Sequence, residues 1–264
     1  MPGKMSDQNQ LPFEDINPDS EPKEEKIGRV VRVLPDVGGV DRPFDYLVPS
    51  DWITTGRDKG LQVGSRVRIP FGPRRVAGWI VEDHVDPPKG VKLRELTKIS
   101  GMGPSSEIIK VARWVSYRWA GKLSSVLKTA SPLRNINRLP SSPSNISIGA
   151  IPPVWAIEAL EKSKRVLRMP PTEDVLPLIK AAIRKGDVLV IVPSIDMSKS
   201  FTDSLEKIGI PVSLMPHHWA KAAAGGVVVG TRSAVLAPVR KLAAILVFDE
   251  HNEALKEERM PTWH

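Results

Sequence analysis

The pair Asp249-Glu250 comes directly after an apolar run, AAILVF, near the end of the sequence. A buried strand that ends in two carboxylates can hold Mg²⁺, because this ion prefers oxygen ligands and binds together with the phosphates of a nucleotide. ATP-driven motors hold their metal ion in this way. The pair therefore raises the question whether the chain also contains a loop that binds phosphate.

The stretch that should supply this loop lacks the necessary residues. A loop of the form GxxxxGK[ST] offers backbone N–H groups, a lysine and a hydroxyl to the nucleotide, and it follows the first strand of the sheet. We place that strand at residues 165–169, RVLRM. The following segment, residues 170–185, has no glycine, begins with two prolines that have no N–H, and includes Glu173 and Asp174, which would repel phosphate. We therefore expect a degenerate acidic motif and no ATP hydrolysis by this chain.

The composition favours a partner that carries many negative charges. The chain has 264 residues, enough for two domains, and a net charge of +8. Its first 26 residues carry a net charge of −4, so the remainder carries +12. Such a charge is typical of proteins that bind nucleic acid, and an ordinary basic surface is the alternative.

Cysteine and apolar content limit the class of protein further. The sequence has no cysteine, which excludes a disulfide framework and Cys-ligated zinc within this chain. No apolar run reaches the about 18 residues of a membrane span, and the start has no apolar signal segment. We therefore expect a cytoplasmic protein without a membrane partner.

The first half of the chain divides into a leader, a small domain and a linker. Residues 1–26 are polar and acidic, which predicts a disordered leader. Residues 27–131 contain short alternating strands separated by Gly and Pro turns, with helices over 105–131, and predict a small β-rich domain of α+β class. Residues 132–152 are rich in Ser, Pro and Asn and predict the linker.

Residues 153–264 have a different character, because apolar strands alternate with helices. The expected strands are 165–169, 187–193, 211–215, 226–231 and 243–250, and the expected helices are 173–185, 196–208 and 217–224. Uniformly apolar strands separated by helices favour an α/β domain whose parallel sheet is covered on both faces.

Five motifs occur in the order in which one known family has them. They are DRPFDYLVP, GSRVRIPFG, VARWVSYRWAGKLSSVLKTASP, VVVGTRSAVLAPVRKLAAILVFDE and MPTWH. With these motifs, residues 27–264 resemble the family of primosomal protein N′ (PriA), the bacterial replication-restart helicases, and most of all its actinobacterial type without the usual ATP loop. The resemblance implies a module that captures the 3′ end of a nascent strand at a stalled fork, followed by an incomplete, RecA-like first lobe of a superfamily-2 helicase.

The resemblance also implies which residues contact DNA. Phe44, Asp45 and Gly72 match pocket residues for the terminal nucleotide, and Arg94 stands where the family usually has a lysine near the pocket. An aromatic ring can stack on a base, a carboxylate can accept a hydrogen bond, glycine permits close approach, and arginine can hold a phosphate. Contacts to the DNA backbone are expected from Arg66, Arg68, Arg74, Arg75, Thr231 and Arg232.

These residues also have purely structural interpretations. Phe44 and Phe71 could be core residues, Asp45 could cap the turn after Pro43, and the arginines could form a solvated strand face. Three tryptophans are expected in the core rather than as stacking platforms: Trp79, Trp114 and Trp119.

The chain departs from the family pattern near its end. The acidic motif usually reads DEEHD and here reads DEHNE, so that Asp249 and Glu250 remain. The sequence stops within the first lobe, before the second lobe and the zinc-binding cysteines of the family, as expected for a fragment or a natural short form. We therefore expect no cofactor in this chain, although the family uses ATP with Mg²⁺ and binds zinc.

Our interpretation is a nucleoid-associated, DNA-binding protein of replication restart that recognises forked DNA or 3′ ends. Expected protein partners are the single-strand binding protein and other primosome proteins. The first alternative is an ATP-dependent 3′→5′ DNA helicase, and the second is a scaffold without enzymatic activity on which primosome proteins dock. Steep salt dependence would favour nucleic-acid binding over protein docking.

Overall fold

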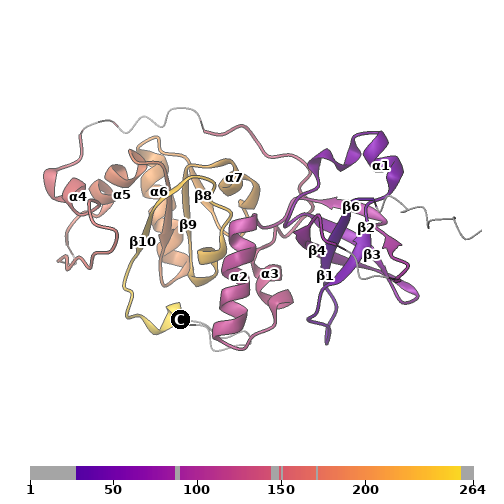
Figure 1. The fold of residues 1–264 in the computed structure, drawn as a ribbon. Helices are drawn as coiled ribbons and strands as arrows, with labels where there is room; N and C mark the ends of the chain where they lie inside the picture. The colour runs from indigo at the N-terminus through magenta and orange to yellow at the C-terminus, as the bar shows by residue number, and fades with distance from the viewer. Residues whose placement is uncertain (1–27, 87–89, 144–148, 150, 171, 257–264) are drawn as a thin grey trace, which may run out of the picture.

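The computed structural model describes residues 28–86, 90–143, 149, 151–170 and 172–256. Figure 1 shows a β-rich part at one end, two helices in the middle and a second, parallel sheet at the other end. The predicted leader, residues 1–26, lies outside the described residues. In the described part of the chain, no helix is both long enough and apolar enough to cross a membrane.

The first sheet has six strands in the order β5-β2-β1-β4-β3-β6. They are β1 (Val30–Pro35), β2 (Phe44–Leu47), β3 (Arg66–Phe71), β4 (Arg74–Asp83), β5 (Arg94–Glu95) and β6 (Lys98–Gly101), with helix α1 (Ser50–Thr54) and the 3-10 turn η1 (Arg57–Gly60) between β2 and β3. The strands predicted from alternation are thus confirmed. The sheet curls on itself, so that β3 comes near β2 and the end of β5. Thr97 N, just after β5, donates to Arg68 O of β3 at 2.9 Å, and the Tyr46 hydroxyl of β2 donates to Pro70 O of β3 at 3.2 Å.

Helices α2 (Ser106–Arg118) and α3 (Leu123–Ala130) pack on the outside of this curled sheet. The Ser105 hydroxyl caps α2 by accepting a hydrogen bond from Ile108 N at 3.3 Å. The buried residues of α2 are Ile109, Ala112 and Val115. The expectation that Trp114 lies in the core was wrong, because this side chain is 57% exposed.

The predicted linker begins in contact with the first sheet. Its described residues have neither helix nor strand. Met102 N donates to Ile136 O at 2.6 Å, and the Arg66 Nη1 donates to Pro132 O at 3.3 Å. These contacts hold the start of the segment against the end of β6.

The second sheet has four parallel strands in the order β10-β7-β9-β8. The strands are β7 (Asp187–Ile191), β8 (Val212–Leu214), β9 (Val227–Gly230) and β10 (Leu242–Val247). The helices are α4 (Val154–Glu158), α5 (Leu176–Ile183), α6 (Ile195–Lys207) and α7 (Trp219–Ala224), with 3-10 turns η2 (Arg232–Leu236) and η3 (Glu253–Leu255). Residues of α5 and α6 pack on one face, and residues of α7 and η2 on the other. The predicted parallel sheet, covered on both faces, is confirmed.

The strand predicted at 165–169 is absent, and this prediction was wrong. Residues 165–170 have no regular structure, and Val166 is 77% exposed. Only two apolar residues, Val166 and Leu167, separate the charged Arg165 and Arg168, so the segment has little surface to bury as a strand. Among the described residues, no strand pairs with the outer edge of β10.

The two halves of the molecule pack against each other through α3 (Figure 1). The Trp219 indole at the start of α7 donates to Ala130 O at 2.8 Å, and this contact is buried. Leu236 of η2 joins the apolar cluster of α2 and α3 and is 2% exposed. The β-rich part and the parallel sheet therefore share a core at their junction.

Candidate nucleic-acid interface

Three of the four predicted pocket residues lie at one edge of the curled sheet. Phe44, the first residue of β2, packs edge-on against Phe71, with 5.6 Å between the ring centroids and 71° between the planes. The Arg94 Nη1 at the start of β5 donates to Gly72 O at 3.3 Å. The guanidinium of Arg42 lies 5.0 Å from the centroid of the Phe44 ring. This edge thus combines aromatic surface with two cationic side chains.

Gly72 gives this edge an open stretch of backbone in the turn between β3 and β4. It is exposed and has a φ of 56°, in the left-handed region that favours glycine. Apart from Gly72 and its two neighbours in the chain, no residue has an atom within 4 Å of the position where a Cβ would stand. A ligand can therefore approach the main chain here more closely than at any residue with a side chain.

Asp45 lies on the opposite face of β2 from Phe44, because successive side chains of a strand alternate between the two faces. Its carboxylate accepts from the Arg32 Nε at 2.7 Å and from the Arg32 Nη2 at 3.2 Å, and its side chain is 11% exposed. The Arg32 Nη1 also donates to Glu82 Oε2 at 2.8 Å. Hydrogen bonding to Asp45 raises the pKa of Arg32 above its ordinary value and outweighs the opposite effect of burial.

Sequence reasoning placed Asp45 beside Phe44 and missed its partner Arg32. The signal was present in the alternation of VVRV, where Arg32 interrupts a run of buried residues. The pairing itself depends on the register between β1 and β2, in which Arg32 stands opposite Asp45. That register cannot be read from the sequence.

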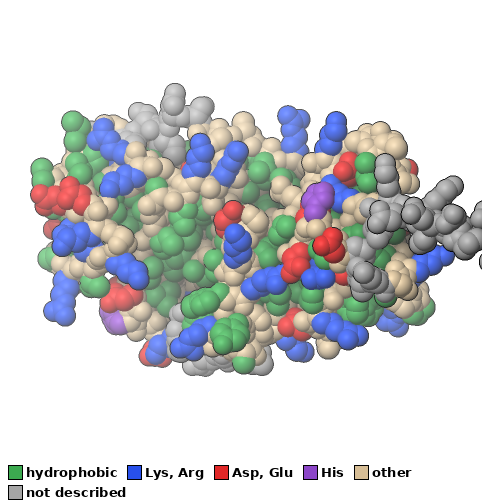
Figure 2. Space-filling view, viewed as in Figure 1, with side chains coloured by type: hydrophobic (Ala, Val, Ile, Leu, Met, Phe, Trp, Pro, Cys, Tyr) green, Lys and Arg blue, Asp and Glu red, His purple; other side chains and the backbone are tan. Residues whose placement is uncertain are grey.

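The predicted backbone contacts form a basic rim on the hairpin of β3 and β4. Arg68, Arg74 and Arg75 are exposed, and the Arg68 Nη1 donates to Arg75 O at 3.4 Å. Arg66 is less exposed, because its guanidinium contacts Pro132 O. Figure 2 shows Lys and Arg side chains spread over both halves of the face in view, with exposed hydrophobic side chains among them.

The remaining predicted residues gather at the second sheet, where parallel strands end together. Thr231 and Arg232 follow β9, and Asp249 and Glu250 come just after β10. The register pairs Val247 with Ile191 and Ile191 with Gly230, so these loops share one edge. The Arg232 Nη1 donates to Ala254 O at 3.1 Å, and Asp249 has a φ of 48°.

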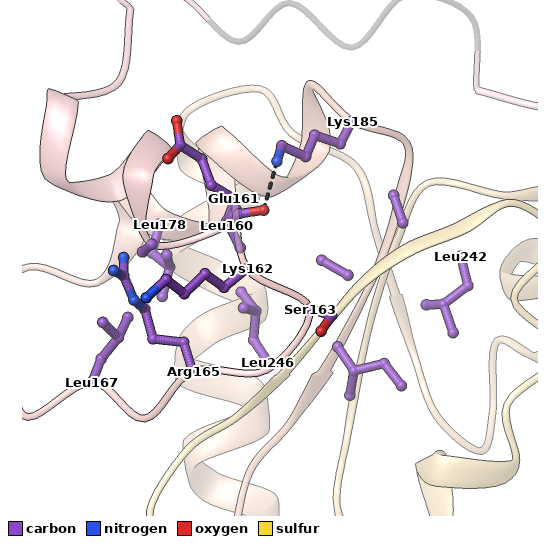
Figure 3. A pocket seen from close by; sticks show the side chains of 14 residues that line it. Leu160, Glu161, Lys162, Ser163, Arg165, Leu167, Leu178, Lys185, Leu242 and Leu246 are labelled. Carbon is purple, nitrogen blue, oxygen red and sulfur yellow. Dashed lines mark hydrogen bonds between the residues drawn. The ribbon is translucent and has the colours of Figure 1, made fainter.

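Two cavities in the described part of the chain lie away from all of these residues. One, of about 570 Å³, lies between β10 and the segment after α4 (Figure 3). Lys162, Arg165 and Lys185 are among the residues that line it, together with leucines, and the Lys185 Nζ donates to Leu160 O at 2.6 Å. A second, of about 590 Å³, lies between the start of the linker and α7. Neither is lined by a predicted site residue.

Comparison with known proteins shows which domain the first half of the chain contains. Residues 25–132 match the PriA family model described as the 3′DNA-binding domain (3′BD). The chain is 29% identical over 260 residues to the probable replication restart protein PriA of Mycobacterium tuberculosis, which covers 85% of this chain and 39% of that protein. The chain is thus similar to PriA replication restart proteins, and residues 25–132 match their 3′DNA-binding domain. It is also 35% identical over 105 residues to PriA of Thermotoga maritima, covering 35% of this chain and 14% of that protein.

The PriA-type domain contains the whole first group of candidate residues. Phe44, Gly72, Arg94 and the arginines of the β3–β4 hairpin all lie within the matched residues 25–132. Thr231, Arg232 and the acidic pair lie beyond them, in the part that only the comparison with whole PriA chains covers. This chain spans about 39% of the length of the mycobacterial relative.

Proposed function

We propose that this chain is a DNA-binding protein of replication restart whose first domain binds the 3′ end of a DNA strand at a fork. The observation that carries the proposal is the match of residues 25–132 to the 3′DNA-binding domain of PriA proteins. The geometry of the Phe44 edge supports it, because this edge offers the chemical groups that a strand end requires.

The terminal nucleotide would lie against the Phe44–Phe71 pair. The part of these half-buried rings that faces solvent can stack on a base of any type, which suits an end that varies in sequence. The sugar would approach the open backbone at Gly72, and Arg94 would contact the adjacent phosphate. The exposed arginines of the β3–β4 hairpin would follow the strand backbone without reading its sequence.

Asp45 does not line this edge, because it lies on the opposite face of β2 and is paired with Arg32. The Gly72 oxygen accepts one hydrogen bond from Arg94 and has a second lone pair, so it could accept from a terminal hydroxyl. A 3′-phosphate is mostly a dianion at pH 7 and has no proton to donate to this oxygen. The proposed end preference is therefore for a 3′-OH.

Variants of Phe44 and Arg94 test whether the strand end binds at this edge of the sheet. We expect Phe44→Leu and Arg94→Gln each to weaken binding of a DNA with a recessed 3′ end about five- to fiftyfold, which corresponds to about 1–2.3 kcal/mol. Arg184→Gln, an exposed arginine on the parallel-sheet half, is the matched control and should bind like the wild type. Fluorescence anisotropy of the full chain gives the affinities, and equal affinities for all four proteins would contradict the site.

The salt dependence of the same binding tests the basic rim. If the three exposed arginines contact phosphates, the triple change of Arg68, Arg74 and Arg75 to Gln should reduce the slope of log K against log salt by about 2–3. An unchanged slope would place the phosphate contacts elsewhere. A flat slope in the wild type would favour the scaffold alternative, in which proteins rather than DNA dock on this domain.

For the second half we propose a helicase-like lobe that does not hydrolyse ATP. This proposal is supported by the irregular structure of residues 165–170 and by the prolines and acids before α5, which offer no cradle of N–H groups. We expect no ATP hydrolysis above background, with or without forked DNA, in a phosphate-release assay. DNA-stimulated hydrolysis that Asp249→Asn abolishes would contradict this and favour the 3′→5′ helicase alternative.

A further inference from the structure

One face of α2 presents two large aromatic side chains that are mostly exposed to solvent. Trp114 is 57% exposed and Tyr117 is 88% exposed, and Val111 beside them is 41% exposed. The apolar residues that hold α2 on the sheet lie on its opposite face. Apolar side chains that lie together on the surface of a protein often mark a binding site.

The two aromatic residues form a continuous surface, and a contact with Trp119 holds the Trp114 ring in place. Residues three positions apart on a helix are neighbours, so Trp114 and Tyr117 lie side by side. The Trp114 ring packs edge-on against Trp119, with 5.2 Å between centroids and 89° between planes. The Arg118 guanidinium lies 5.4 Å from the centroid of the Trp119 ring. A ring held in this way loses little conformational freedom when a ligand stacks on it.

The charges around this surface suit a polyanion. Lys110 and Arg118 stand four positions before and after Trp114, which places one cation on each side of the ring. Arg113 precedes Trp114 and is also exposed. Glu107, in the first turn, is the one acidic residue of α2. Aromatic rings between cations are the arrangement on which successive bases of a single strand stack while its phosphates meet Lys and Arg.

The α2 face is also continuous with the outer face of the β-rich domain. The Arg113 Nη2 donates to Glu82 Oε1 at 2.7 Å, and Glu82 accepts from Arg32, which also holds Asp45. These four charged side chains form a row from α2 across β4 and β1 to β2. Figure 1 shows α2 between the β-rich part and the parallel sheet.

We propose that the exposed face of α2, formed by Val111, Trp114 and Tyr117 with Lys110 and Arg118, is a sequence-independent stacking platform for single-stranded nucleic acid. Bases stack on Trp114 and Tyr117, and the two cations contact the adjacent phosphates. The platform goes beyond the 3′-end site, because it needs no strand terminus. It binds an interior stretch of a strand.

A closed single-stranded DNA circle tests the platform, because a circle has no end for the 3′ site. In anisotropy measurements with the full chain, we expect Trp114→Ala and Tyr117→Ala each to weaken binding of the circle about five- to a hundredfold. Trp155→Ala changes a tryptophan of α4 that is 36% exposed and serves as the matched control, with affinity equal to wild type. Trp114→Phe keeps an aromatic ring and should restore most of the affinity.

The outcomes separate the platform from the 3′-end site. Failure of the wild type to bind the circle, or equal affinities of wild type, Trp114→Ala and Tyr117→Ala, would overturn the platform and leave the face to a protein partner. If the wild type shows no preference for a 3′-OH but the α2 variants still lose the circle, the platform stands and the 3′-end proposal falls.

Discussion

Arg29, just before β1, joins three segments of the β-rich domain. Its guanidinium donates to Asp83 at 3.1 and 2.6 Å, to the Asp58 carboxylate at 3.0 Å and to Leu61 O at 2.7 Å. Burial alone raises the pKa of Asp83, but the hydrogen bonds and charge of Arg29 outweigh it, so the pKa of Asp83 lies below its ordinary value. This group of residues fixes η1 against the start of β1 and the end of β4, which lie side by side.

The lowered pKa predicts how stability depends on pH at this residue. A carboxylate whose pKa is lower in the folded state stabilises the fold fully above its unfolded pKa of about 4, and this contribution is lost as pH falls through the folded value. We expect Asp83→Asn to reduce the free energy of unfolding by about 1.5–3 kcal/mol at pH 7. Urea unfolding of both proteins at pH 7 and at pH 3 measures the effect. A penalty of equal size at both pH values would contradict the role of the ion pair.

The contacts that individual site residues make were only partly predictable from the sequence. The resemblance to the PriA family grouped Phe44, Gly72 and Arg94 in one pocket, and in the structure these three residues lie near one another. It did not reveal that Asp45 faces away and is held by Arg32, since strand register decides which side chains meet. The roles of all these residues stay predictions.

At the scale of elements, patterns with one clear period were predictable. The alternation in β3 and β4 predicted two strands with one buried face, and the apolar runs of the second half predicted β7 to β10. The prediction of a strand at 165–169 was wrong because the apolar run there is only two residues long. On α2, Trp114 was expected in the core, but the helix packs on the sheet through the face of Ile109 and leaves Trp114 exposed.

At the scale of the whole molecule, the junction at α3 determines whether the halves act together. Leu236 of η2 is part of the α2–α3 core, and Trp219 donates to Ala130 O. The composition of residues 132–152 predicted a boundary but could not show these contacts, because they join residues far apart in sequence.

This shared core predicts one cooperative unfolding transition for the full chain. A charge at position 236 would be buried without a partner, so Leu236→Asp should separate unfolding into two transitions. Leu133→Asp, at a position that is 68% exposed near the same boundary, is the control and should leave one transition. Calorimetry measures this, and two transitions in the wild type would show that the halves are energetically independent.

The central claim is that the PriA-type domain recognises a 3′ strand end, and the chemistry of that end tests it most directly. The measurement is the anisotropy of the full wild-type chain on two identical recessed DNA duplexes, one ending in a 3′-OH and one in a 3′-phosphate. The account predicts about two- to tenfold tighter binding of the 3′-OH end, because the hydroxyl can donate a hydrogen bond to Gly72 O and the phosphate cannot, and such a bond contributes about 0.5–1.5 kcal/mol. Equal affinity for both ends would contradict it and leave only binding to a basic surface.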